Sequence, residues 1–461
     1  MARATKSEAG PGSAPRLLPT AIAALLTRGV LMPMALVQGA LLARGLGPAG
    51  LGAYAAALVD VNLLVALLSL GLPGGLAIAA GQARGQGEGE SIIAALRKLS
   101  WRHGLAMAGA LLVSAPLYAQ LAPRLSLPLR TPAVLALIVG LVLLQFVRDV
   151  HNALLWGGQR FAVQNRINLL VQLALSVLLF VLWRAGWLQP ESALGLQLAA
   201  YVLWIVAARS VPAETVAPPS PDPTLSSPPP DVSRGDLQAR VRAIGLRSYV
   251  GVLLDLLLLR IDIYLIEKLV PPAVMAHELG LYQAGVRVAE LVLFVPSTLN
   301  AVLFAKAAAA EDVALCTLRS AKLSLWLGLL ALACMWLVGQ PLLVLVFGAR
   351  FAGSFAPCLW VLLGCVMTCF ASPLAGTLSG EHGYPRSILW AQLLALLANV
   401  GANVYLLPRY GIVGAAQASA LSYALSAGLI AAAFARRYGL SLGTLLRPSL
   451  PWTLWRQLRA A

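Results

Sequence analysis

The feature that most constrains this chain is the recurrence of apolar runs long enough to cross a lipid bilayer. A membrane-spanning helix needs roughly 20 mostly apolar residues at about 1.5 Å rise per residue. Such runs lie near residues 18–43, 51–80, 103–122, 132–156, 166–187, 192–208, 246–269, 281–305, 321–347, 354–379, 386–407 and 412–435. The sequence therefore predicts an all-α polytopic membrane protein with about 12 transmembrane helices.

The composition agrees with this class and argues against a soluble domain. Hydrophobic residues make up 59% of the chain and charged residues 11%, against about 25% charged residues in an ordinary soluble domain. A formal net charge of +16 would indicate nucleic-acid binding in a soluble protein, but here the cations lie mostly between the apolar runs. Because the positive-inside rule explains that placement, we expect no nucleic-acid partner.

A segment rich in proline and serine, from Val211 to Asp231, divides the runs into two groups of six. It contains almost nothing that could be buried, so we expect a disordered linker. The predicted organisation is an N-terminal tail, a first six-helix bundle, the linker, a second six-helix bundle and a C-terminal tail, with boundaries at 1–17, 18–208, 209–240, 241–438 and 439–461.

The distribution of lysine and arginine predicts the orientation in the membrane. If the N-terminus faces the cytoplasm, 23 of the 34 Lys and Arg residues fall in inside segments and 7 in outside segments. A helix missed in the count would invert the later segments and remove this bias. We therefore expect both termini and the linker to be cytoplasmic.

The two halves also contain equivalent short motifs. The tetrapeptide LGAY begins the second run at Leu51, and LGLY begins the eighth run at Leu279. Each is followed by a proline, Pro73 in the first half and Pro296 in the second. Equivalent elements in the same order, with an even number of spans in each half, predict parallel repeats with the substrate bound between them.

Motifs of soluble enzymes are absent or better explained otherwise. The stretch GLGPAG at 45–50 fits G-x-G-x-x-G, but it follows a membrane run and has a proline where a phosphate-binding turn needs free amides, so we expect a tight interhelical turn. Neither a Walker A sequence nor an HExxH pair occurs. Cys365 and Cys369 share a helical face without nearby His or carboxylate, so packing is expected. We expect no enzyme activity, cofactor or metal.

Charged residues within the predicted spans are the candidate functional groups. An ionised side chain at membrane depth costs from about 2.5 kcal/mol upward, so such residues face protein or water and often mark a transport pathway. The candidates are Arg28, Asp60, Arg148, Asp149, Asp255, Arg260, Asp262, Arg287 and Glu290. Arg287 and Glu290 are three residues apart and are expected to be able to pair on one helix. The alternative for each residue is a tie between helices.

Three stretches carry a resemblance to a known family. These are LLARGLGPAGLGAYAAALVDVNLLVALLSLGLP, RIDIYLIEKLV with the following ELGLYQAGVRVAELVLFVPSTLNAVLFAKAA, and LPRYGIVGAAQASALSY near the C-terminus. They resemble the Wzx-type polysaccharide-repeat flippases of the MOP superfamily. The resemblance implies two six-helix bundles around a V-shaped central cavity. It also implies transport of an undecaprenyl-diphosphate-linked oligosaccharide from the cytoplasmic to the periplasmic leaflet.

The residue chemistry agrees with a diphosphate substrate. Arginine holds phosphate through forked, charge-assisted hydrogen bonds, so the expected headgroup ligands are Arg28, Arg260 and Arg287. The side chains expected to contact sugars are Tyr54, Tyr249, Tyr264, Tyr282, Asn62, Asn300 and Gln38. A place in the aromatic belt of the membrane interface remains open for each tyrosine. Asp60 and Glu290, one in each half, are the expected ion-coupling carboxylates.

Two other functions remain open at this stage. A cation-coupled multidrug exporter of the MATE type would need an acidic, aromatic-lined cavity, and a membrane scaffold of an envelope-assembly complex would use the buried charges only to tie helices together. For a flippase, the expected location is the bacterial inner membrane. The expected partners are the lipid-linked oligosaccharide, the bilayer, and a polysaccharide polymerase or other assembly proteins.

Overall fold

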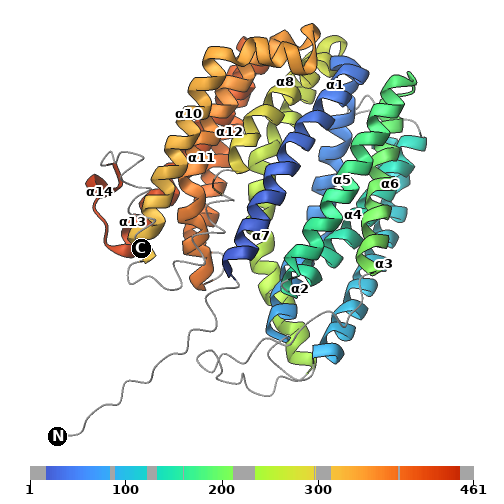
Figure 1. Cartoon of the computed structure of the whole chain (residues 1–461), viewed down its shortest axis with the longest axis vertical. Helices are drawn as coiled ribbons and strands as arrows, with labels where there is room; N and C mark the ends of the chain where they lie inside the picture. Colours follow the sequence, from blue (N-terminus) through green and yellow to red (C-terminus); the bar gives the residue numbers. More distant parts are fainter. Residues whose placement is uncertain are drawn as a thin grey trace, which may run out of the picture.

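The computed structural model is a bundle of long helices (Figure 1). It describes residues 17–83, 89–121, 132–158, 160–210, 234–294, 296, 313–382 and 385–446, with the backbone alone over stretches such as 17–28 and 234–248. The helices of eight or more residues are α1 (Leu17–Ser69), α2 (Leu72–Ala83), α3 (Gly89–Leu121), α4 (Pro132–Gly157), α5 (Phe161–Arg184), α6 (Pro190–Arg209), α7 (Arg234–Leu269), α8 (Pro272–Glu290), α10 (Val313–Phe347), α11 (Phe355–His382), α12 (Arg386–Tyr410) and α13 (Ile412–Tyr438). Within these residues no strand occurs, in agreement with the predicted all-α class.

The helix α1 is a hairpin of two segments that meet at Gly47. Gly47 has φ 67° and ψ 178°, a conformation outside the helical region that glycine adopts easily. A straight helix would separate Gly39 from Tyr54 by about 22 Å, yet both line one cavity. In Figure 1 the blue ribbon accordingly rises, turns and descends again. This confirms the predicted interhelical turn at 45–50.

The second predicted run, 51–80, is two helices in the structure. Leu70 has φ 48° and Gly71 has φ 70°, so the chain leaves the helical conformation between α1 and α2. Pro73 then lies in the first turn of α2, where a missing backbone N–H costs nothing. The proline therefore starts a new helix, whereas the sequence pattern had placed it inside a span.

Two helix starts in the second half also differ from prediction. The helix α8 begins at Pro272, with Pro271 as its N-cap, and not near 281, because proline is well suited to the first helical position. The helix α7 begins at Arg234, inside the segment predicted as linker. The centre of that linker, 211–231, lies outside the described residues. The short helix α14 (Leu442–Leu446) lies in the predicted C-terminal tail, where Lys322 Nζ donates to the carbonyl of Thr444 at 2.9 Å.

Eight helical segments of the described residues are long and apolar enough to cross a membrane: Gly29–Ser69, Ala133–Gly157, Phe161–Arg184, Pro190–Arg209, Val313–Phe347, Ala349–Ser379, Arg386–Tyr410 and Ile412–Tyr438. The first of them is the hairpin α1 and so contains two of the predicted spans. The predicted runs in α3, α7 and α8 are helical as well where the structure describes them. The chain is a multi-pass membrane protein, and the count of about twelve spans stays a prediction.

The two LGxY motifs cross each other where the halves meet. A Cβ atom at Gly52 would overlap the carbonyl oxygen of Ala276 in α8, and a Cβ atom at Gly280 would overlap the carbonyl oxygen of Pro48 in α1. Each glycine therefore permits the backbone of the other half to approach it directly. The sequence pattern had identified these motifs as equivalent, and the structure packs them against each other.

Further contacts bring other chain turns to the same end of the molecule, which we call the turn end. Arg44 Nε donates to the carbonyl of Val346 at 2.9 Å, and its Nη2 donates to the carbonyl of Leu345. The guanidinium thus binds carbonyls of the last turn of α10, which have no partner within the helix. Gly45 packs against Leu188 in the connection between α5 and α6. We call the opposite end, where α6 ends and α7 begins, the linker end.

Candidate functional site

A cavity of about 310 Å³ lies between the two halves of the chain. Its walls come from α1, α5 and α6 on one side and from α8, the 3-10 turn η2 (Leu291–Leu293) and the end of α10 on the other. Its polar and aromatic lining residues are Gln38, Tyr54, Gln197, Arg287, Glu290, Phe294 and Phe347. We call it the central cavity. Of the predicted site residues, it brings together Gln38, Tyr54, Arg287 and Glu290.

Arg287 is the cation of the central cavity that is available to a ligand. Among the described residues, its guanidinium has no hydrogen bond and no ion pair. A Cβ atom at Gly39 would lie 3.8 Å from Arg287 Nη1, so the absence of a side chain there leaves room for the guanidinium. A fork of five N–H donors in a largely apolar cavity is well suited to an anion.

The spacing of Arg287 and Glu290 had suggested that they pair, but in the structure they do not. Arg260 of α7 binds Glu290 instead, with Nη1 to Oε1 at 2.7 Å and Nη2 to Oε2 at 3.1 Å. Both side chains are about three-quarters buried. This two-bond contact between planar groups is stronger than a single contact along one helix. Arg260 is thus a tie between α7 and α8, and of the predicted headgroup arginines with a described side chain, Arg287 is the one that lines the central cavity.

Tyr282 does not line the central cavity. It is fully buried, and its hydroxyl donates to the carboxylate of Asp262. Asp262 also accepts from Ser419 Oγ at 3.2 Å and from the backbone N–H of Ile263 at 2.9 Å. These bonds join α7, α8 and α13 and satisfy the carboxylate. The geometry favours a structural tie over the predicted contact with sugars.

Asp60 is bonded across the interface between the halves. Tyr264 of α7 donates its hydroxyl to Asp60 Oδ1 at 3.0 Å. Glu267, one turn further along α7, is close enough to Asp60 for the two carboxylates to interact electrostatically. Two acids from opposite halves form an arrangement that protons or cations can bind. Asp60 was a predicted site residue and Glu267 was not, although Glu267 stands near the end of the apolar run 246–269.

A second cavity, of about 430 Å³, lies nearer the linker end. Its walls come from α1, α2, α4 and α7, and its polar and aromatic lining residues include Asn62, Gln145, Asp149, Asn152, Trp156 and Tyr249. We call it the linker-end cavity. Asn62 and Tyr249 were predicted site residues. Gln145 and Asn152 were not, although an amide inside the apolar run 132–156 is a signal that could have found Gln145.

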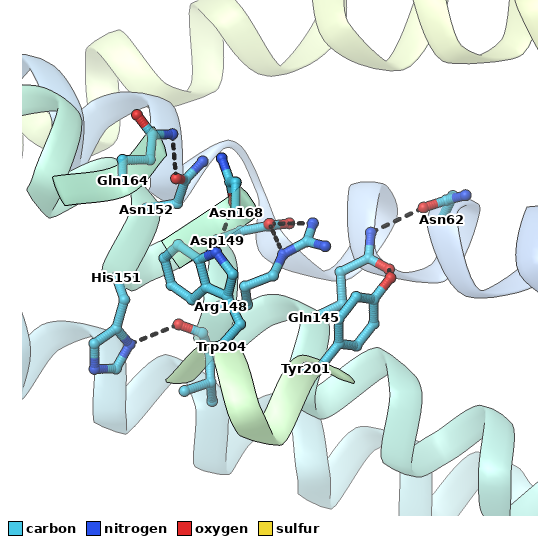
Figure 2. A network of polar contacts seen from close by, with 11 residues as sticks. Asn62, Gln145, Arg148, Asp149, His151, Asn152, Gln164, Asn168, Tyr201 and Trp204 are labelled. Carbon is cyan, nitrogen blue, oxygen red and sulfur yellow. Dashed lines mark hydrogen bonds and ion pairs between the residues drawn. The ribbon is translucent and has the colours of Figure 1, made fainter. Parts of the chain in front are cut away.

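Figure 2 shows a polar network that includes four of the residues lining this cavity: Asn62, Gln145, Asp149 and Asn152. Gln145 Nε2 donates to Asn62 Oδ1 at 2.9 Å, and Tyr201 donates its hydroxyl to Gln145 Oε1 at 3.1 Å. Arg148 donates from Nε and Nη2 to Asp149 Oδ1 at 3.1 and 2.8 Å. The Arg148 guanidinium also lies 4.6 Å from the centre of the Tyr201 ring. The two charges neutralise each other within α4, and the contact of Arg148 with Tyr201 of α6 is of the kind that the sequence had left open as a tie between helices.

Two predicted site residues cannot be placed relative to the cavities. The side chain of Arg28 and all of Asn300 lie outside the described residues. Within the part of the chain that the structure describes, no group of three or more His, Cys, Asp or Glu residues has the arrangement of a metal site.

The fold is shared with solved transporters of the MOP superfamily. One is described as the inward-facing conformation of a multidrug resistance MATE family transporter; it matches with a TM-score of 0.62 and 14% identity over 93% of this chain and 100% of that one. The structure thus shows a multi-pass helical membrane protein with the fold of these transporters, and the predicted all-α fold class is confirmed.

Two further solved structures show how varied this architecture is. The lipid II flippase MurJ in an inward closed conformation matches with a TM-score of 0.62 and 12% identity over 96% of this chain and 92% of MurJ. A MOP-superfamily transporter from Pyrococcus furiosus, described as having a binding pocket of reverse polarity, matches with a TM-score of 0.63 and 16% identity. The match covers 92% of this chain and 95% of that transporter. The sequence matches no protein-family model and no curated protein. At these identities the likeness concerns the fold.

Proposed function

We propose that this protein is a flippase of the MOP architecture that moves an anionic, lipid-linked oligosaccharide across the bacterial inner membrane. The substrate class is an undecaprenyl-diphosphate carrier, transported by alternating access from the cytoplasmic to the periplasmic leaflet. The termini and the linker face the cytoplasm in this proposal, as the cation bias indicates.

The observation that carries the proposal is Arg287 in the central cavity. The cavity wall holds one neutralised carboxylate, because Glu290 is bound by Arg260, and one cation without a partner among the described residues. Its net charge is therefore positive. A diphosphate cannot enter hydrocarbon without a charge partner, and a guanidinium in a low-dielectric cavity supplies one.

The test measures binding of the lipid diphosphate carrier without its sugars. The full chain in lipid nanodiscs is titrated with undecaprenyl diphosphate, and Arg287→Ala is expected to weaken binding by about 10- to 100-fold, because hydrogen bonds to a charged group contribute about 1.5–3 kcal/mol. Arg287→Lys keeps the charge but loses the planar fork of N–H donors. Its affinity should lie between those of the unmodified protein and of Arg287→Ala. Arg184→Ala removes an exposed cation at the end of α5 and is the matched control.

Two measurements, binding of the carrier and its transport, separate this proposal from its alternatives. Unchanged binding in Arg287→Ala rejects the headgroup role. Transport of the carrier is then followed in proteoliposomes, where loss of transport in Arg287→Ala, with the control unaffected, is expected for a flippase. A scaffold would show no transport in the unmodified protein.

A cation-coupled exporter is the second candidate, and the pair Asp60 and Glu267 favours it. Carboxylates contributed by both halves are able to bind a proton, a sodium ion or a cationic substrate and thereby bias one conformation. Efflux of a cationic dye from proteoliposomes under a proton or sodium gradient tests this function. Efflux that Asp60→Asn abolishes, and that undecaprenyl diphosphate does not inhibit, would establish the exporter in place of the flippase.

A further inference from the structure

We propose that the linker-end cavity is a binding site for neutral sugar, held by Asn62, Asn152 and Asp149. The inference rests on the proposed function, because it assigns the oligosaccharide of the same substrate to a second place in the molecule. It goes further in naming a cavity, a chemical class of ligand and the groups that recognise it.

The two cavities follow each other along one face of α1. Tyr54 and Leu58 line the central cavity, and Asn62, Ala66 and Ser69 line the linker-end cavity. Steps of three and four residues keep all five on one side of the helix. Asn62 lies about 12 Å further along the axis than Tyr54. Sugars attached to a diphosphate at Arg287 can therefore extend along this face towards the linker end.

Both asparagines are held by their carbonyl oxygens, which leaves their NH₂ groups for a ligand. Asn62 Oδ1 accepts from Gln145 at 2.9 Å, and Asn152 Oδ1 accepts from Gln164 at 2.5 Å (Figure 2). Among the described residues, neither Nδ2 atom has a hydrogen-bond partner. Since the supporting glutamines fix the amide planes, binding costs little side-chain ordering.

Asp149 supplies an acceptor beside these donors. Arg148 uses only Oδ1 of the carboxylate, and Oδ2 has no hydrogen bond within the part of the chain that the structure describes. Each sugar hydroxyl has one O–H donor and two acceptor positions. Oriented NH₂ groups together with a carboxylate oxygen match that chemistry.

The remaining lining favours a neutral ring over an ion. Among the described lining residues, no lysine or arginine is present, and the one carboxylate is already neutralised by Arg148. An anion would find no free cation there, and a cation would have to compete with Arg148. Trp156 is half exposed and Tyr249 is held by a bond from its hydroxyl to the carbonyl of Leu67 at 3.2 Å. Their rings offer apolar faces to the C–H side of a sugar.

The experiment compares two probes on the full chain in nanodiscs. They are undecaprenyl diphosphate and undecaprenyl diphosphate that carries a neutral trisaccharide. The unmodified protein is expected to bind the second about tenfold more tightly, and Asn62→Ala/Asn152→Ala should remove that preference while it leaves the affinity for the bare carrier unchanged. The control is Asn168→Ala, which loses a bond from Trp204 Nε1 of 2.8 Å but lies outside the cavity lining.

The outcomes distinguish this inference from the proposed function. A double variant that keeps the tenfold preference overturns the sugar site, and so does one that weakens both probes equally. Saturation-transfer NMR on the same variants measures binding of the free trisaccharide, and so tests the sugar site without the lipid. If neither carrier binds but the trisaccharide signal depends on Asn62 and Asn152, the flippase proposal fails and the sugar site stands.

Discussion

The two cavities share a helix but differ in charge and in the way their polar groups are held. The central cavity has a guanidinium that lacks a partner among the described residues. The linker-end cavity has a neutralised ion pair and two amides held in place by other side chains. The first therefore suits an anion and the second a neutral polar ligand.

This difference shows that a buried charge is not by itself a ligand-binding group. Arg260, Arg148 and Arg287 are all arginines within apolar helices, yet the first two are bound to carboxylates. A charge bound to an opposite charge adds no net charge to a cavity, although an oxygen that the partner leaves unbonded, such as Asp149 Oδ2, can still accept a hydrogen bond. Of these three, Arg287 is the arginine without such a partner among the described residues, and it gives the central cavity a net charge.

The largest expected effect tests whether the crossing of α1 and α8 supports both cavities. Gly280→Val would force a side chain into the carbonyl of Pro48, where the overlapping atoms are backbone atoms and not the end of a flexible side chain. We expect a loss of more than about 4 kcal/mol of stability, at the upper end for single substitutions. Fluorescence-detected size-exclusion chromatography of a fusion protein measures the folded fraction.

The control for that variant is Gly428→Ala, because a Cβ atom there meets nothing within 4 Å. Replacement of glycine by alanine inside a helix should be neutral or stabilising by up to about 1 kcal/mol. A folded Gly280→Val protein that binds either probe normally would show that the crossing does not hold the cavities together.

The next effect sharpens the contrast between the two arginines of the central region. Arg260→Ala leaves Glu290 buried without its partner, which typically costs about 3–5 kcal/mol. Arg260→Ala/Glu290→Ala removes both charges and should recover most of the loss, while Arg287→Ala should change stability by less than about 1 kcal/mol. Unfolding midpoints in detergent provide the measurement. A double variant as unstable as Arg260→Ala would contradict the assignment of Arg260 as a tie.

The smallest expected effect concerns the support of the linker-end cavity. Gln145→Leu removes the donor that holds Asn62 and the acceptor for Tyr201, without removing a group proposed to touch sugar. We expect the preference for the sugar-bearing carrier to fall about threefold, as one hydrogen bond is worth about 0.5–1.5 kcal/mol. Affinity for the bare carrier should not change. Equal losses for both carriers would indicate general damage to α4 and no positioning role.

Much of the fold could be predicted because it depends on local properties of the sequence. Run length and polarity predicted the helices, and the glycines and proline of 45–50 predicted the turn that Gly47 makes. The helices α7 and α8 begin at Arg234 and Pro272, before the predicted apolar runs 246–269 and 281–305, because polar residues such as His277 continue a helix that leaves the apolar zone. Apolar run length locates the membrane better than it locates helix ends.

The candidate site was predicted less completely. The sequence indicated Tyr54 and Tyr282 as equivalents, but one lines the central cavity and the other binds Asp262 in the interior. Gln145 and Asn152 were not predicted, although the uncharged Asn62 and Gln38 were. Their importance depends on neighbours from other helices.

The sequence by itself thus determined the membrane class, the helical architecture and the set of charged residues that had to be accommodated. The tertiary structure alone decided that Glu290 binds Arg260, 30 residues away along the chain, and leaves Arg287 to the cavity. The physical reason is that helix periodicity specifies only neighbours three or four residues apart. The pairing of charges on different helices depends on how the packed helices align. That alignment results from contacts such as that of Gly52 with α8.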